Sequence, residues 1–124
     1  MIKLVLPWPP SVNKYWRHPT TGKLAGRHLI SEQGRAYREA VRSIFQGWPS
    51  ACMVHRPITG PVVVDIEAFM PDRRRRDLDN LLKGLLDSLT HAGVWEDDNQ
   101  VVDLRIRKAA EIGGMVKVQI SEAT

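Results

Sequence analysis

Six leucines between residues 78 and 89 constrain the fold of this chain more than any other feature. They recur at helical spacing, as Leu78, Leu81, Leu82, Leu85, Leu86 and Leu89. Apolar side chains at this spacing form one stripe along an α-helix, and such a stripe has to be buried against a core. Asp77 stands where an N-cap belongs, and Gly93 follows the last periodic residue. The pattern therefore predicts a helix from Asp77 to His91.

Charged residues gather at the start of this predicted helix. Four consecutive arginines precede the acidic residues Asp77 and Asp79; they are Arg73, Arg74, Arg75 and Arg76. Lys83 lies one helical turn beyond Asp79 on the polar face. Two carboxylates beside an ammonium suit Mg²⁺, which binds one or two carboxylates together with waters and phosphate oxygens. A metal ion held there could activate water against a phosphodiester.

A second acidic group, made of Glu96, Asp97 and Asp98, follows the helix. The predicted helix is roughly 21 Å long at about 1.5 Å per residue. The seven steps from its end to Asp98 span about 23–25 Å when fully extended. Asp98 therefore returns to the start of the helix only if this link is nearly straight or if the helix ends early. Otherwise, Asp98 serves a site on another subunit.

Each of these features also has an ordinary structural interpretation. Asp77 can be a helix cap, and Asp79 with Lys83 can be an exposed ion pair. The second acidic group can be a solvated turn, and the arginines can form a solvated loop or bind nucleic acid without chemistry. A calcium loop starting at Asp77 fits poorly, because its sixth position is Leu82 rather than glycine and its twelfth is Ser88 rather than glutamate.

The N-terminal quarter of the chain predicts a basic and aromatic surface. An apolar opening stretch reads as a strand that ends in prolines, and a short hairpin around residues 21–22 follows. Lys14 and Arg17 lie beside Tyr15 and Trp16, a combination suited to phosphates and exposed bases. The alternative is that the aromatic side chains pack in the core, which we expect for one of the two.

A second helix is predicted between Ser31, its N-cap, and Gly47. Its polar face carries Arg35, Arg38 and Arg42. Such a basic face either meets solvent or follows the DNA backbone.

Three segments alternate between apolar and polar residues as strands do, at 62–70, 102–107 and 115–120. The last two are separated by a Gly-Gly turn, which predicts an antiparallel hairpin. Because helices do not regularly separate the strands, a doubly wound parallel fold is disfavoured. We expect a single α/β or α+β domain over residues 1–124, with a mixed or mainly antiparallel sheet and two principal helices.

Composition narrows the class of protein. A chain of 124 residues suffices for one modest core, and 18 Lys and Arg against 14 Asp and Glu favour a polyanionic partner. The single cysteine, Cys52, excludes an internal disulfide, and His18, His28, His55 and His91 have no metal-binding spacing. A reducing, cytoplasmic setting follows. The prolines interrupt the apolar N-terminus before it is long enough for a signal sequence or a membrane span.

Three motifs resemble those of the RusA family of Holliday-junction resolvases, which are small phage-derived or prophage endonucleases. The motifs are LPWPPSVNKYWRH, PDRRRRDLDNLLKGLLDSL and WEDDNQVVD. The resemblance runs from about residue 4 to residue 120, although residues 46–61 contain no recognisable motif. It implies a RusA-like homodimer that cuts four-way DNA junctions with paired symmetric nicks in recombination and repair. It also implies a need for Mg²⁺, with Mn²⁺ as a substitute, and no small-molecule cofactor or membrane.

Motif positions in this family assign the site residues. The essential aspartates correspond to Asp77, Asp79 and Asp98, the functional lysine corresponds to Lys83, and Asp97 is a neighbour that can share the metal. The four arginines would bind flanking phosphates. Two alternatives stay open at this point, a non-catalytic DNA-binding or architectural protein and a metal-dependent RNA nuclease.

Overall fold

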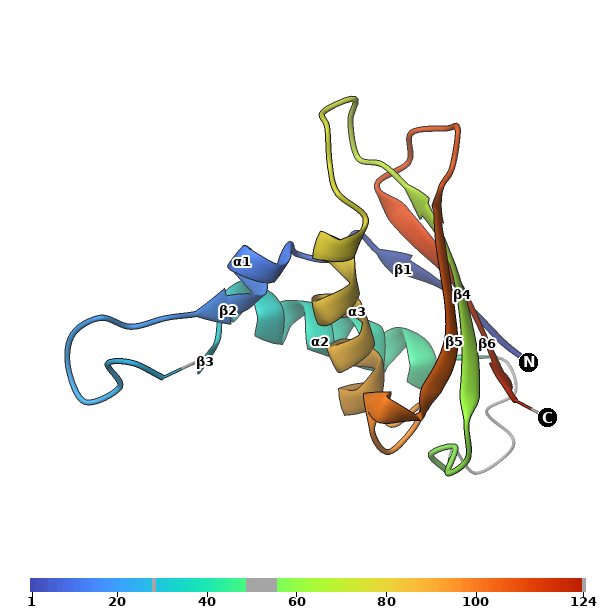
Figure 1. The fold of residues 1–124 in the computed structure, drawn as a ribbon, viewed down its shortest axis with the longest axis horizontal. Helices are drawn as coiled ribbons and strands as arrows, with labels where there is room; N and C mark the ends of the chain where they lie inside the picture. Colours follow the sequence, from blue (N-terminus) through green and yellow to red (C-terminus); the bar gives the residue numbers. More distant parts are fainter. Residues whose placement is uncertain (28, 49–55, 124) are drawn as a thin grey trace.

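The fold is a four-stranded sheet with its principal helices on one face (Figure 1). The computed structural model describes residues 1–27, 29–48 and 56–123, so the observations above on His28, Cys52 and His55 lie outside the described residues. The four strands are β1 (Ile2–Pro7), β4 (Val62–Phe69), β5 (Val101–Lys108) and β6 (Met115–Glu122). The principal helices are α2 (Glu32–Gln46) and α3 (Asp79–Ala92). Shorter elements are α1 (Val12–Tyr15), β2 (Trp16–Arg17), β3 (Leu29–Ile30) and the 3₁₀ turn η1 (Asp98–Gln100).

The strand order is β1-β6-β4-β5, with β4 parallel to β5 and antiparallel to β6. The prediction of a mainly antiparallel mixed sheet with two principal helices is confirmed. The predicted hairpin of residues 102–120 is wrong, because β4 lies between β5 and β6. β4 pairs with β5 on one side and with β6 on the other, and its inner side chains are fully buried. The crossover through α3 supplies the parallel neighbour, and alternation in the sequence carries no information about which strand fills which place.

The leucine stripe of α3 divides into two rows. Leu81, Leu85 and Leu89 are buried in the core. The second row, Leu78, Leu82 and Leu86, is only partly buried. The leucine stripe is therefore wider than the face of α3 that the rest of the described chain covers.

The start of α2 and the end of α3 agree with the capping residues predicted from the sequence, but α3 starts later than expected. Ser31 Oγ accepts the Gly34 N–H at 3.0 Å, and this confirms the N-cap of α2. Gly93 closes α3 in the left-handed conformation at φ 88°. Residue 79 is the first of α3, its N-cap Leu78 has helical dihedrals and no side-chain cap is formed, so the capping role predicted for Asp77 is wrong. The carboxylate of Asp77 is thus left for other partners.

The predicted hairpin in the N-terminal quarter exists as a two-residue ladder in which Trp16 pairs with Ile30. Its connection projects away from the sheet (Figure 1). Tyr15 is the aromatic residue that packs inside, whereas Trp16 is partly exposed. Gly34 lies so close that a Cβ there would be 2.6 Å from the Tyr15 carbonyl oxygen, which fixes the base of the hairpin against α2. Within the described ranges, no helix is long and apolar enough to cross a bilayer.

Candidate active site at the two ends of helix α3

The N-terminal end of α3 presents its charged side chains to solvent. Asp77, Asp79 and Lys83 are all exposed. Lys83 Nζ lies 5.6 Å from the centroid of the Trp16 ring, a cation–π contact. The Trp16 ring is perpendicular to the ring of Tyr15, with the two centroids 5.2 Å apart. The base of the hairpin therefore holds the lysine that the family motif singles out, and no Asp79–Lys83 ion pair forms in the described structure.

The arginine-rich loop before α3 is organised around Asp72. Its carboxylate accepts the Arg74 backbone N–H at 2.9 Å and pairs with Arg76 Nη2 at 2.9 Å. The backbone N–H of Arg74 and then the guanidinium of Arg76 hold the pKa of Asp72 below its ordinary value. Arg73 and Arg75 are exposed, as is the side chain of Arg74. Three of the four arginines of the loop therefore point outward, and Arg76 turns back to pair with Asp72 of the same loop.

The C-terminal acidic group is held by a capping box. Asp97 is the N-cap of η1 and accepts the Asn99 N–H at 3.0 Å. Gln100 Oε1 accepts the backbone N–H groups of Glu96 and Asp97, both at 2.9 Å. Gln100 Nε2 donates to the carbonyls of residues 58 and 60 at 2.7 and 2.9 Å. Asp98 is partly buried and takes no part in this cap, so its position is fixed while its carboxylate stays available.

The two acidic groups lie at opposite ends of α3. The helix has 14 residues, about 20 Å at 1.5 Å per residue, and separates Asp79 from the turn that holds Asp98. The sheet also keeps the two acidic groups apart. Val101, which follows the second acidic group, pairs with Val62 at the start of β4, whereas the arginine loop follows the end of that strand. In the described part of the chain, no group of three or more His, Cys, Asp or Glu side chains could hold a metal ion.

Two of the three routes that would bring the acids together are therefore closed within one chain. The helix runs its full length, and Asp98 begins η1, which comes before the chain turns back as β5 (Figure 1). The third route, in which Asp98 serves a site on another subunit, is compatible with the described structure. The assignment of Asp77, Asp79, Asp97 and Asp98 as metal ligands stays a prediction.

A network that the sequence did not predict links α2 with the middle of α3. The Tyr15 hydroxyl donates to Asp87, and Arg38 reaches the same carboxylate through Nη2 at 2.5 Å and Tyr15 through Nε at 2.8 Å. Burial acts to raise the pKa of Asp87, but the bonds from Tyr15 and Arg38 outweigh it and lower that pKa. In the sequence, Asp87 is 72 residues from Tyr15 and 49 residues from Arg38, so no local pattern reveals the network.

This network changes the interpretation of one predicted DNA contact. The guanidinium of Arg38 is largely covered and paired with Asp87, so a phosphate would have to displace that carboxylate to reach it. Arg35 and Arg42 are exposed on α2. Lys14 and Arg17 are also exposed, at the base of the hairpin. Phosphate binding by these four residues stays a prediction.

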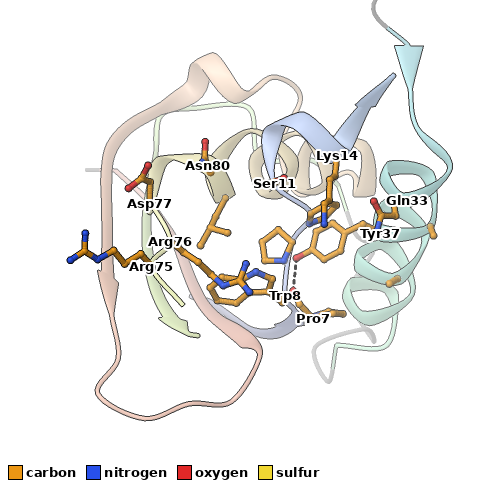
Figure 2. A pocket seen from close by; sticks show the side chains of 15 residues that line it. Pro7, Trp8, Ser11, Lys14, Gln33, Tyr37, Arg75, Arg76, Asp77 and Asn80 are labelled. Carbon is orange, nitrogen blue, oxygen red and sulfur yellow. Dashed lines mark hydrogen bonds between the residues drawn. The ribbon is translucent and has the colours of Figure 1, made fainter. Parts of the chain in front are cut away.

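A groove of about 710 Å³ opens beside the N-terminal end of α3. Figure 2 shows Trp8 and Arg76 at one end of it, with Asp77 on one side and Gln33 on the opposite side. The proline-rich segment after β1 forms much of its floor, where the Tyr37 hydroxyl donates to the Pro7 carbonyl at 2.7 Å. The sequence pattern marked this segment as the end of a strand and as part of a family motif, but it gave no sign of a groove.

Comparison with known proteins gives consistent matches. The model of the family described as endodeoxyribonuclease RusA matches residues 7–121. The crossover junction endodeoxyribonuclease of Enterobacteria phage 82 is 48% identical over 120 residues, which cover 96% of this chain and 92% of that protein. The corresponding enzymes of Shigella sonnei strain Ss046 and Escherichia coli strain K12 are 47% and 46% identical over the same shares of each chain.

Proposed function

This chain belongs to the RusA family of endodeoxyribonucleases, and from this premise we propose that it resolves four-way DNA junctions at metal sites shared between two subunits. It is a crossover junction endodeoxyribonuclease, and the enzymes of this family are generally dependent on a divalent metal. The specific proposals are that the metal is Mg²⁺, that the active form is a homodimer, and that each dimer makes paired symmetric nicks.

The observation that carries the shared site is the separation of the acids along α3. A twofold axis across the middle of this helix would pack two α3 helices side by side in opposite directions. The N-terminal end of one helix would then lie beside the C-terminal end of the other. Asp77 and Asp79 of one subunit would meet Asp98 of its partner, and the same operation would build a second site.

An incompletely covered apolar surface lies between the two acidic ends. The partly buried row Leu78, Leu82 and Leu86 belongs to it. Leu104 of the edge strand β5 faces the same side of the sheet as Val64, yet 38% of it is exposed. Apolar side chains lose contact with water when a partner covers them, and this contributes favourably to association. A second copy packed here would bury them and form the dimer.

The residues brought together in this way fit a hard divalent cation. Asp77, Asp79 and Asp98 supply carboxylate oxygens, and Asp97 retains a second oxygen beside the one used in its cap. A bound Mg²⁺ would supply Lewis-acid polarisation of the phosphate and a water of lowered pKa. Lys83, held against Trp16, would donate to the oxygen on which charge develops.

The outward-facing arginines would hold the DNA flanking the cut. Arg73, Arg74 and Arg75 carry positive charge next to the acids and favour a polyanionic substrate. They also reduce repulsion between the carboxylates and the phosphates that must approach them. The twofold symmetry of the dimer would match two cuts related by the approximate symmetry of a four-way junction.

The direct test is cleavage of a synthetic four-way junction by purified protein in Mg²⁺, with an EDTA control and the Asp79→Asn variant. We expect paired symmetric nicks from the wild type. Loss of a metal-binding carboxylate removes several kcal/mol of charge stabilisation, so Asp79→Asn should cleave about a thousandfold more slowly and still bind the junction.

Duplex DNA and structured RNA are the comparison substrates. Tight binding without cleavage in Mg²⁺ and Mn²⁺ would favour an architectural protein, and preferential cleavage of RNA would favour an RNA nuclease. Either result would refute the proposal.

A further inference from the structure

We propose that the groove beside the start of α3 is a nucleotide subsite, in which an unpaired nucleotide next to the scissile phosphate stacks on Trp8 and is read by Gln33. The inference rests on the proposed function, because it places this nucleotide beside the acids that would cut its backbone. It adds a binding site that none of the sequence motifs assigns.

The floor of the groove suits the flat face of a base. Trp8 packs partly against the core and exposes the rest of its surface to the groove. The neighbouring proline rings and the buried ring of Tyr37 complete an apolar surface. Aromatic side chains that offer such a surface stack on bases of any sequence. A volume of about 710 Å³ lies within the range of small-molecule sites and is enough for a nucleotide.

The rim of the groove supplies what the floor lacks, namely groups that recognise a base edge. Gln33 in the first turn of α2 and Asn80 in the first turn of α3 both line the groove. Neither side-chain amide has a hydrogen-bond partner within the described residues. An amide can donate and accept together, which allows it to distinguish one base edge from another.

Charge at the groove favours a phosphate ester over a neutral ligand. Lys14, Arg75 and Arg76 face one acidic residue, Asp77, so the lining carries a positive excess. Arg76 already pairs with Asp72, so the positive excess rests on the exposed side chains of Lys14 and Arg75. An anionic oxygen would pair with either of these groups, and a phosphodiester provides one.

The shape of the groove favours an unpaired nucleotide. A base within a duplex has both faces covered by its neighbours, so Trp8 could not stack on it. Unstacking costs least where pairing is already disturbed, as at the branch point of a junction. Because Asp77 lines the same groove, a nucleotide held there would place its adjoining phosphate near the N-terminal acids.

The first test measures base preference. Junctions that carry each of the four bases next to the scissile phosphate are cut by wild type, by Gln33→Ala and by Gln46→Ala. Gln46 is also exposed on α2 but does not line the groove, so it is a matched control. We expect the wild type and Gln46→Ala to prefer one base, and Gln33→Ala to reduce that preference about tenfold or more. An unchanged preference in Gln33→Ala, or no preference in the wild type, would overturn the proposal.

The second test does not require cleavage. A junction with 5-iodouracil at the branch point is irradiated with the wild-type protein in EDTA, and the cross-linked residue is identified by mass spectrometry. Cross-linking to Trp8 that Trp8→Phe retains and Trp8→Ala removes is expected. Cross-linking at Trp16 instead would move the base to the hairpin and overturn the proposal. If the wild type cross-links at Trp8 but cuts no junction, the proposed function fails while the subsite stands.

Discussion

The two ends of α3 carry the same kind of side chain in opposite structural settings. At the N-terminal end, Asp77 and Asp79 are exposed and the helix start has no side-chain cap. At the C-terminal end, Asp97 closes a capping box and Gln100 ties the turn to the chain before β4. One end therefore presents its carboxylates loosely, and the other holds them in a fixed frame.

This difference would explain how a chain can fold while carrying the acids of the proposed metal site. Carboxylates gathered without a cation repel one another, and this repulsion would destabilise a monomer that contained the complete site. A helix about 20 Å long keeps the two groups apart. In the proposed dimer, a rigid acidic end would meet a more adaptable one, and the cation would compensate for their repulsion.

The largest expected effect comes from mixing two inactive variants. Asp79→Asn and Asp98→Asn should each lose cleavage as homodimers. If the sites are shared between subunits, a mixed dimer has one site with both substitutions and one with neither. Equal mixing should then restore about one quarter of the wild-type sites, and each active dimer should nick one strand. Gel analysis of nicked and resolved products measures both quantities.

The same mixture decides between a shared site and a site within one chain. If each site belonged to a single chain, both sites of the mixed dimer would carry a substitution, and no activity would return. A mixture of Asp77→Asn with Asp79→Asn is the matched control, because both residues belong to the same end of α3. That mixture should remain inactive under either arrangement.

A smaller effect is expected when the frame of the C-terminal end is removed. Gln100→Ala leaves every carboxylate in place but removes four hydrogen bonds around Asp97. Loss of groups that orient metal ligands typically costs about 10–100-fold in metal affinity. We therefore expect cleavage to need correspondingly more Mg²⁺, with junction binding in EDTA unchanged. Gln119→Ala, on the exposed side of β6, is the control, and an equal Mg²⁺ requirement in both variants would contradict this role for Gln100.

The smallest effect separates the structural acid of α3 from the acids at its ends. Asp87→Asn weakens the bonds to Tyr15 and Arg38 and should lower the free energy of unfolding by about 1–2 kcal/mol at pH 7. Because its partners lower the pKa of Asp87 in the folded state, the stabilisation is complete above the ordinary carboxyl pKa of about 3.9 and is lost as the pH falls further.

Urea unfolding at pH 7 and at pH 3 measures this contribution. The difference between wild type and Asp87→Asn should shrink at the lower pH. Asp79→Asn should destabilise the protein less at pH 7, because within the described residues Asp79 has no hydrogen-bond or ion-pair partner and only its interaction with the N-terminal end of the helix is weakened. An equal loss of stability in both variants would remove the distinction between these acids.

Much of the fold could be read from local patterns. The leucine spacing gave the existence of α3, Gly93 its end and Ser31 the start of α2, because helix periodicity and capping depend on neighbours within one turn. The sequence could not show that β4 lies between β5 and β6 in place of the predicted hairpin. A strand has the same alternation of apolar and polar residues whichever strand it pairs with. The division of Tyr15 and Trp16 between core and surface also depended on what the rest of the chain places beside them.

The residues of the candidate site follow the same division. By itself the sequence predicted which side chains would carry the chemistry, since the order of arginines, acids and lysine is a local and specific pattern, and family resemblance adds the roles proposed for them. Only the tertiary structure decided that the acids lie at opposite ends of α3, that Arg38 is bound to Asp87, and that Trp8 and Gln33 line one groove. The physical reason is that spacing along a chain limits the distance between two residues, whereas packing sets the distance itself.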